Sequence, residues 1–429
     1  MNESFLSYLW TFKLIKTPLY STEGEEIVIK RQGFKNEDAG PDFLNAFIKI
    51  GHSMWAGNVE IHVRSSDWYK HKHHTNEKYQ SVILHVVYED DLQTDEEKKL
   101  NIPCLELKGI FDVFLFLKYE SFMNNTHWIP CEKQIKNINH FRFYYFMSRM
   151  AIERLESKAL KIQEQLQLNK NNLEQTFYEQ LARNFGFKTN ADAFEMLAKS
   201  LPINYLAKQK SNLFQIEALL FGQAGMLNKN FKDAYPKKLQ KEYSFLQKKY
   251  NLQAIPSQVW KFLRLRPSNF PTIRISQFAM LIYLSSVLLS KIIEAENVDQ
   301  IRNYFDVSAS DYWNTHFNFE KECTATKKQL GAQSTNLIII NTIIPFSFVY
   351  GKLMGEDQYC QKALKFMESL DGEQNKIIRQ WKKIGVNTKS AFFTQALIHL
   401  KSTYCEQKRC LDCQIGHELL KQKENNLSI

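Results

Sequence analysis

The sequence predicts two fold classes in one chain: an α/β domain with a mixed sheet over residues 1–130, and an all-α domain over residues 136–400. Strand-like runs bounded by Gly, Pro, Asp and Asn dominate the first part. Beyond residue 136, apolar residues recur every three or four positions, as in amphipathic helices. The 429 residues, 44% of them hydrophobic, are enough for two filled cores. A tail over residues 401–429 carries three cysteines.

The α/β domain is expected to begin with a helix over residues 3–15, followed by five strands. We expect these strands at residues 25–33, 42–50, 57–65, 81–89 and 103–109. The second and third form a hairpin, and residues 68–80 leave room for a loop or short helix before the fourth. In the second domain, long helical patterns cover residues 141–168, 172–187, 190–201, 212–227 and 237–252.

The apolar runs and the cysteines predict a cytoplasmic protein without a membrane partner. The run at residues 278–293 meets Lys291 too early to span a bilayer, which needs about 20 apolar residues. No basic segment precedes the apolar residues at the start of the chain, so a secretory signal is not expected. Seven cysteines, mostly scattered, fit a reducing compartment.

Positive charge is concentrated in one window. The chain has a net charge of +10, and residues 229–274 hold eight Lys and three Arg against two acidic residues, a net +9. Such a stretch is typical of a polyanion binder, and equally of a solvated helix face. Within it, Arg264, Arg266 and Arg274 surround two prolines and are the predicted phosphate contacts, with an interdomain clamp as the alternative.

An acidic motif lies in the predicted hairpin. Asp42 follows "GP" at the start of one strand, while Glu60 and His62 alternate on the next and so share a face. A hairpin brings Asp42 near Glu60, and two adjacent carboxylates favour a divalent cation such as Mg²⁺ or Mn²⁺. Such an ion activates water and neutralises charge on a phosphate.

The predicted elements follow one another as helix, strand, strand with "GPD", strand with "EIH", helix and strand. This order resembles the core of the PD-(D/E)xK nuclease superfamily. This resemblance implies a restriction-endonuclease-like sheet, with Asp42 and Glu60 as metal carboxylates. His62 stands where that superfamily has lysine, and neutral histidine is a poor constant charge. Over its full length the chain also resembles a bacterial family known only as a domain of unknown function, through stretches such as "NEDAGPDFLNAFI" and "QIEALLFGQAG".

Histidines offer a second metal hypothesis. His62, His71, His73, His74 and His85 are five of the chain's eleven histidines and lie within 24 residues. A site made of His62, His85 and one loop histidine, joined by Asp42 or Glu60, suits Mn²⁺, Zn²⁺ or Fe. In the alternative, His85 is a hydrogen-bonded core residue and the loop histidines are solvated.

The tail predicts a third metal site. Cys405, Cys410 and Cys413 can converge on one ion, because a C-x-x-C turn directs both sulfurs inward. The fourth ligand is either His417, giving a local zinc site, or the distant Cys131. The second arrangement resembles the iron–sulfur staple of some helicase-associated and CRISPR-associated nucleases. Reduced thiols without metal are the remaining alternative.

Taken together, the motifs favour a metal-dependent nuclease-like protein whose partner is nucleic acid. Asp42, Glu60 and His62 would carry the catalysis. The alternatives are a non-catalytic nucleic-acid-binding or assembly protein with the same fold, and a His-rich metallohydrolase of a small substrate. No P-loop, GxGxxG or GxSxG motif occurs, which argues against the usual nucleotide and serine hydrolases.

Overall fold

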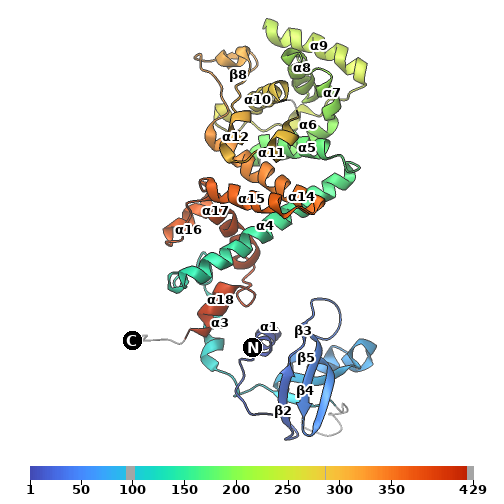
Figure 1. The fold of residues 1–429 in the computed structure, drawn as a ribbon, viewed down its shortest axis with the longest axis vertical. Coiled ribbons are helices and arrows are strands. Elements are labelled where there is room, and N and C mark those ends of the chain that lie inside the picture. Colours follow the sequence, from blue (N-terminus) through green and yellow to red (C-terminus); the bar gives the residue numbers. More distant parts are fainter. Residues whose placement is uncertain (93–101, 286, 423–429) are drawn as a thin grey trace. The chain divides into compact units, whose positions relative to one another are not determined.

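A computed structural model describes the chain except for residues 93–101, 286 and 423–429 (Figure 1). The described residues form two compact units, one of residues 1–143 and 401–429, the other of residues 144–400. The cysteine-containing tail, which the sequence suggested as a separate segment, therefore belongs to the same unit as the N-terminal sheet.

A mixed sheet organises the first unit, which confirms the predicted α/β class with a mixed sheet. Its strand order is β1-β2-β4-β5-β6-β7, with β3 paired to β4. Pairing is antiparallel from β1 to β5 and parallel from β5 to β7. The strands are β1 Leu19–Tyr20, β2 Glu26–Arg31, β3 Phe34–Lys35, β4 Phe43–Ile50, β5 Ser53–Arg64, β6 Val82–Glu89 and β7 Cys104–Glu106.

Helices complete this unit before and after the sheet. Helix α1 (Glu3–Thr11) packs against β5 and begins at Asn2, whose side chain accepts a hydrogen bond from the backbone of Phe5. The short helix α2 (Asp67–Lys70) follows β5 and leads towards the parallel strand β6. Helices α3 (Val113–Asn124) and α18 (Gln414–Lys421) pack together near the end of the chain.

Strands β5 and β6 form the buried centre of the sheet. Residues 82–87 of β6 are all buried, as expected for a strand in a parallel sheet with both faces covered. Gly57 lets β5 approach β6 closely, since a Cβ there would lie 2.4 Å from the Ile83 side chain and 2.6 Å from the Ser81 carbonyl oxygen. The pairing of β5 with β6 sets Glu60 beside His85.

The second unit is helical, as its periodicity predicted. Its helices and the helix leading into it are α4 His140–Leu168, α5 Leu173–Phe185, α6 Phe187–Ser200, α7 Ile203–Ala207, α8 Leu213–Gln223, α9 Ala234–Tyr250, α10 Pro271–Leu284, α11 Leu288–Glu294, α12 Val298–Tyr304, α13 Ala332–Ile338, α14 Ile344–Met354, α15 Asp357–Ser369, α16 Lys376–Lys383 and α17 Ala391–His399. A small hairpin, β8 His316–Asn318 and β9 Lys321–Glu322, accompanies them.

One continuous helical segment among the described residues, Ala332–Met354, is long and apolar enough to cross a membrane. Most of its apolar window, 67%, is buried inside the protein, which fits a core helix. Residues 271–284 and 288–294 pass the same test only as a pair, and they are bent by 78° at the break between them. The cytoplasmic location stays a prediction.

Candidate metal centre

Two carboxylates meet where β4 and β5 pair. Phe43 pairs with Val59, so the preceding Asp42 lies opposite Glu60. The backbone N–H of Asp42 donates to Glu60 Oε2 at 3.1 Å, and the N–H of Ile61 donates to Asp42 Oδ2 at 3.0 Å. Each carboxylate is therefore held by the backbone of the strand opposite. A β-bulge follows in β4, between Phe43 and Ala46.

Two histidines lie beside the other oxygen of Glu60, and a third lies beside those two. Glu60 Oε1 lies 3.5 Å from His62 Nε2 and 3.4 Å from His73 Nε2. His71 Nδ1 lies 3.2 Å from His62 Nε2, and one nitrogen of each of the three histidines lies within 4.8 Å of the others. Ligand atoms around one ion are about 3.0–3.4 Å apart when metal–ligand distances are about 2.1 Å. The three observed distances, 3.2–3.5 Å, are close to this spacing, so these side chains could hold one metal ion. We call Glu60, His62, His71 and His73 the histidine centre.

His85 lies behind this centre and not in it. Its Nε2 atom is 2.9 Å from Nδ1 of His62, and both side chains are buried. A metal-bound histidine usually donates its second ring N–H to such a partner, which fixes its tautomer and orientation. The sequence proposed His85 as a ligand together with one loop histidine. The structure instead brings two loop histidines, His71 and His73, to the centre and leaves His85 as the partner of His62.

Aromatic rings position the histidine loop. The ring of Tyr79 stacks on His73 at a centroid distance of 3.8 Å. The buried indole of Trp68 contacts the rings of His62, His73 and His85 at 5.2–6.4 Å. Sequence reasoning missed both aromatic residues. The sequence feature that could have identified them is their position: they flank the loop histidines in the segment between β5 and β6.

Burial sets the protonation of these groups. It lowers the pKa of His62 to about 3 and that of His85 to about 4, with neighbouring histidines adding to the effect at His62. Both rings are therefore neutral at pH 7, the form that binds metal. Burial, followed by the charge of Asp42, raises the pKa of Glu60 to about 8. The pKa of Asp42 is also raised by burial, so this pair of carboxyl groups favours a proton or a cation.

Glu3 is a further acidic residue near the site that sequence reasoning missed. It is the first residue of α1. Its pKa is raised overall, first by burial and then by the charge of Asp42, while His71 acts in the opposite direction. Its carboxylate therefore lies within electrostatic reach of both the acidic pair and the histidine centre. No sequence spacing links a residue at the start of a helix to a hairpin 40 residues later, so only the packing of α1 reveals it.

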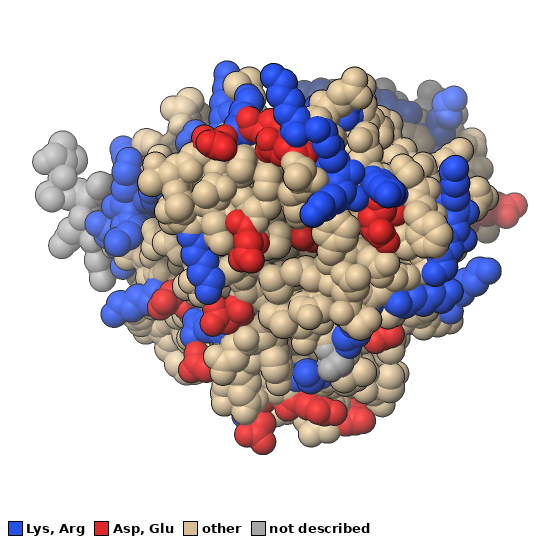
Figure 2. All heavy atoms as spheres, turned by 90° about the horizontal axis from the view of Figure 1, so that it is seen from above, with Lys and Arg blue, Asp and Glu red and all other residues tan. Residues whose placement is uncertain are grey.

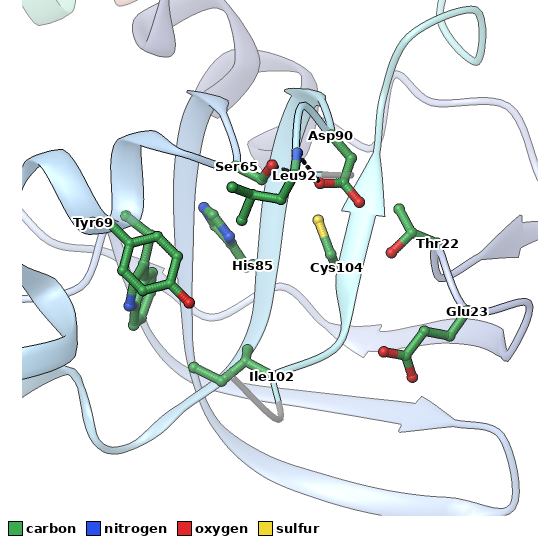
Figure 3. A pocket seen from close by; sticks show the side chains of 10 residues that line it. Thr22, Glu23, Ser65, Tyr69, His85, Asp90, Leu92, Ile102 and Cys104 are labelled. Atoms are coloured by element: carbon green, nitrogen blue, oxygen red, sulfur yellow. Dashed lines mark hydrogen bonds between the residues drawn. The ribbon is translucent and has the colours of Figure 1, made fainter. Parts of the chain in front are cut away.

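A small cavity of about 50 Å³ lies beside His85 (Figure 3). Its lining includes Ser65, Tyr69, Asp90 and Cys104, and the hydroxyl of Ser65 donates to Asp90 Oδ1 at 2.6 Å. The volume suits a few water molecules. The cavity is therefore large enough to hold water next to the buried ring of His85.

The three arginines predicted to contact phosphate differ in their exposure to solvent. Arg264 and Arg266 are exposed, whereas Arg274 is only 5% exposed. The guanidinium of Arg274 donates to Asn269, Gln277 and Ser334 and lies over the Phe187 ring, so it is used inside the second unit. Burial lowers its pKa to about 10. Arg274 is thus not available at the surface to contact a phosphate.

The four predicted cysteine ligands, Cys131, Cys405, Cys410 and Cys413, all lie in the first unit and interact with one another electrostatically. The ring of His417, the alternative fourth ligand, makes other contacts. Its Nδ1 is 2.8 Å from the hydroxyl of Tyr8, and its ring packs on Phe12.

Comparison with known proteins gives one match. A family model described as "Protein of unknown function (DUF2851)" matches residues 3–376. Comparisons with curated proteins and with solved structures gave no match.

Proposed function

This chain belongs to the family described as protein of unknown function (DUF2851), and we propose that its first unit is a metal-dependent hydrolase that cleaves phosphodiester bonds in nucleic acid. The observation that carries the proposal is the grouping of His62, His71 and His73, with Glu60 beside two of them and hydrogen-bonded to the backbone of Asp42. His71 is exposed while His62 is buried, so the centre is anchored in the sheet and open on one side.

The donor set favours a metal softer than Mg²⁺. Imidazole nitrogens suit Zn²⁺, Fe²⁺ and Mn²⁺, whereas Mg²⁺ prefers oxygen ligands alone. Of the two ions expected from the acidic motif, Mn²⁺ fits the three nitrogens better. A divalent cation held here would lower the pKa of a bound water and neutralise charge on a phosphate.

The chain's own residues then have distinct roles. Glu60 and the three histidines would hold the ion, and His85 fixes the orientation of His62 through its contact with Nδ1 of that ring. Asp42 is half-buried and its Oδ2 is fixed by the Ile61 N–H, so its carboxylate is oriented to accept a proton from an attacking water. His62 supplies no permanent positive charge, because burial keeps it neutral.

Two features favour nucleic acid as the substrate. The first unit has the order α1, three antiparallel strands β2, β4 and β5, then α2 and the parallel strand β6. This is the order through which the sequence resembles the PD-(D/E)xK nucleases. The second unit carries a basic surface on α9, whose lysines are exposed. Figure 2 shows Lys and Arg side chains on the face seen from above, with acidic side chains among them. Such a surface attracts a polyanion.

The test is metal-dependent cleavage by purified protein. Protein stripped with a chelator and reloaded with Mn²⁺, Zn²⁺ or anaerobic Fe²⁺ is incubated with end-labelled single- and double-stranded DNA and RNA. We expect cleavage with at least one of these metals, and a loss of 100-fold or more in Glu60→Gln, which removes a charged ligand while keeping the side-chain shape.

His74→Gln is the matched control, because His74 belongs to the same loop but is exposed and outside the histidine centre. It should retain both metal and activity. If the wild type binds metal and nucleic acid but cleaves none of the substrates, the hydrolase proposal fails and a non-catalytic binding protein replaces it. If small phosphodiesters alone are cleaved, the substrate is not nucleic acid.

A further inference from the structure

Four cysteines form a second cluster, which the proposed hydrolase does not use. Cys131 is separated from Cys405, Cys410 and Cys413 by the whole second unit in the sequence, yet all four thiols lie together in the first unit. In each of the six possible pairs, the charge of one thiolate would raise the pKa of the other thiol, so the four sulfurs are near one another. None forms a disulfide, and Cys131, Cys410 and Cys413 are at most 8% exposed. We call these residues the cysteine cluster.

The backbone around the cluster is built to hold the sulfurs in place. Gly416 packs on the backbone of Cys410, where a Cβ atom would lie 2.1 Å from the Cys410 carbonyl oxygen, so only glycine fits. On the other side, the carbonyl of Cys131 accepts the N–H groups of Gln134 and Ile135 in a tight turn. Both segments that provide thiols are therefore rigid at the cysteines themselves.

Contacts outside the cluster join the same two segments. Lys401 lies over the ring of Trp128 at 5.2 Å, and Lys408 donates to the carbonyl of Met123. Further along, the side chain of Gln422 donates to the Asn137 carbonyl at 3.3 Å. The convergence of the thiols thus follows from a docked tail and does not depend on one flexible side chain.

The distance between the sulfurs distinguishes a site for one zinc ion from a site for an iron–sulfur cluster. Zinc–sulfur bonds of about 2.3 Å place four tetrahedral sulfurs about 3.8 Å apart. Within the described part of the chain, the histidine centre supplies the single group of three or more His, Cys, Asp or Glu residues whose ligand atoms all lie within 4.8 Å of one another. No three cysteine sulfurs are that close. In a four-iron cluster each thiolate binds a different iron atom, so the sulfurs are spread further apart than around one ion.

We propose that Cys131, Cys405, Cys410 and Cys413 bind a [4Fe–4S] cluster that fastens the C-terminal tail to the first unit. His417 is not a ligand, because its ring is engaged by Tyr8 and Phe12. On insertion of a preformed cluster, each thiol forms one sulfur–iron bond and loses its proton to solvent. Four protons are released, and no electron is transferred in this step. Buried thiols that repel one another as thiolates gain a cation by this exchange.

The test uses the full-length protein, purified anaerobically and treated with equal amounts of ferrous and ferric iron together with sulfide, which supply the oxidation level of the cluster without another oxidant. We expect about four iron and four acid-labile sulfide per chain, together with a broad visible absorbance that bleaches on reduction with dithionite. One zinc per chain that iron and sulfide do not replace would overturn the proposal, as would the absence of any metal at the cluster. These measurements on the wild type do not depend on whether a variant folds.

Variants then identify the ligands. Cys131→Ser and Cys410→Ser should each lose the chromophore, and limited proteolysis should then release the tail. Cys323→Ser, in the second unit and outside the cluster, and His417→Gln should both retain it. Retention in Cys131→Ser with loss in His417→Gln would contradict the proposal and select a local site in the tail. Because the readout is iron and sulfide, the outcome is independent of nuclease activity.

Discussion

Replacing His85 by leucine should weaken metal binding at the histidine centre by about 10- to 100-fold, the usual effect of removing the outer partner of a metal-bound histidine. His85 is buried, and burial lowers its pKa to about 4, so the substitution removes no charge at pH 7. What it removes is the acceptor 2.9 Å from His62 Nδ1. The N–H of His62 is then buried without a partner whenever Nε2 binds metal, at a cost of about 1–3 kcal/mol.

The assay is competition between the protein and a chromophoric chelator for Mn²⁺ or Zn²⁺ at fixed pH, with circular dichroism to show that each variant is folded. His85→Gln should recover most of the affinity, because its amide oxygen can accept the same hydrogen bond. His74→Leu, in the exposed part of the loop, should bind as the wild type does. Wild-type affinity in a folded His85→Leu protein would refute the role assigned to His85.

Two further predictions concern the second unit. The double substitution Arg264→Ala and Arg266→Ala should weaken nucleic-acid binding and make the affinity less dependent on salt, because fewer counterions are released. Fluorescence anisotropy at several salt concentrations measures this, and an unchanged salt dependence would place the contact elsewhere. Burial raises the pKa of Glu217, so its native carboxyl keeps a proton to higher pH than the carboxyl of the unfolded chain, whose pKa is 4.5. Its contribution to stability should therefore fall as pH rises above about 4.5, and Glu217→Gln should reduce that fall in urea unfolding; an identical pH dependence in both proteins would contradict this.

The parts of the site that lie on strands could be predicted from the sequence. Alternation places Glu60 and His62 on one face, and the length of the hairpin brings Asp42 to Glu60. The loop histidines could not be ranked in this way. No periodicity distinguishes His71 and His73 from His74, because the choice depends on how Trp68 and Tyr79 pack the loop.

Tertiary packing also decided what the sequence left open or suggested otherwise. Arg274 follows a proline-containing basic stretch that indicated an exposed loop, but it lies in the first turn of the buried helix α10, and its two terminal nitrogens donate to neighbouring side chains. The sequence offered Cys131 and His417 as the fourth partner of the tail cysteines and favoured Cys131. In the structure the ring of His417 packs on α1.

The account depends most directly on whether one metal ion sits at the histidine centre. Crystals of the full-length protein, grown after chelation and soaked in Mn²⁺, should show one strong anomalous peak within bonding distance, about 2.0–2.3 Å, of His62, His71, His73 and Glu60. The same peak should vanish in Glu60→Gln crystals, while His74→Gln crystals should retain it. The absence of a peak at these four side chains in the soaked wild type would contradict the proposed metal-dependent hydrolase.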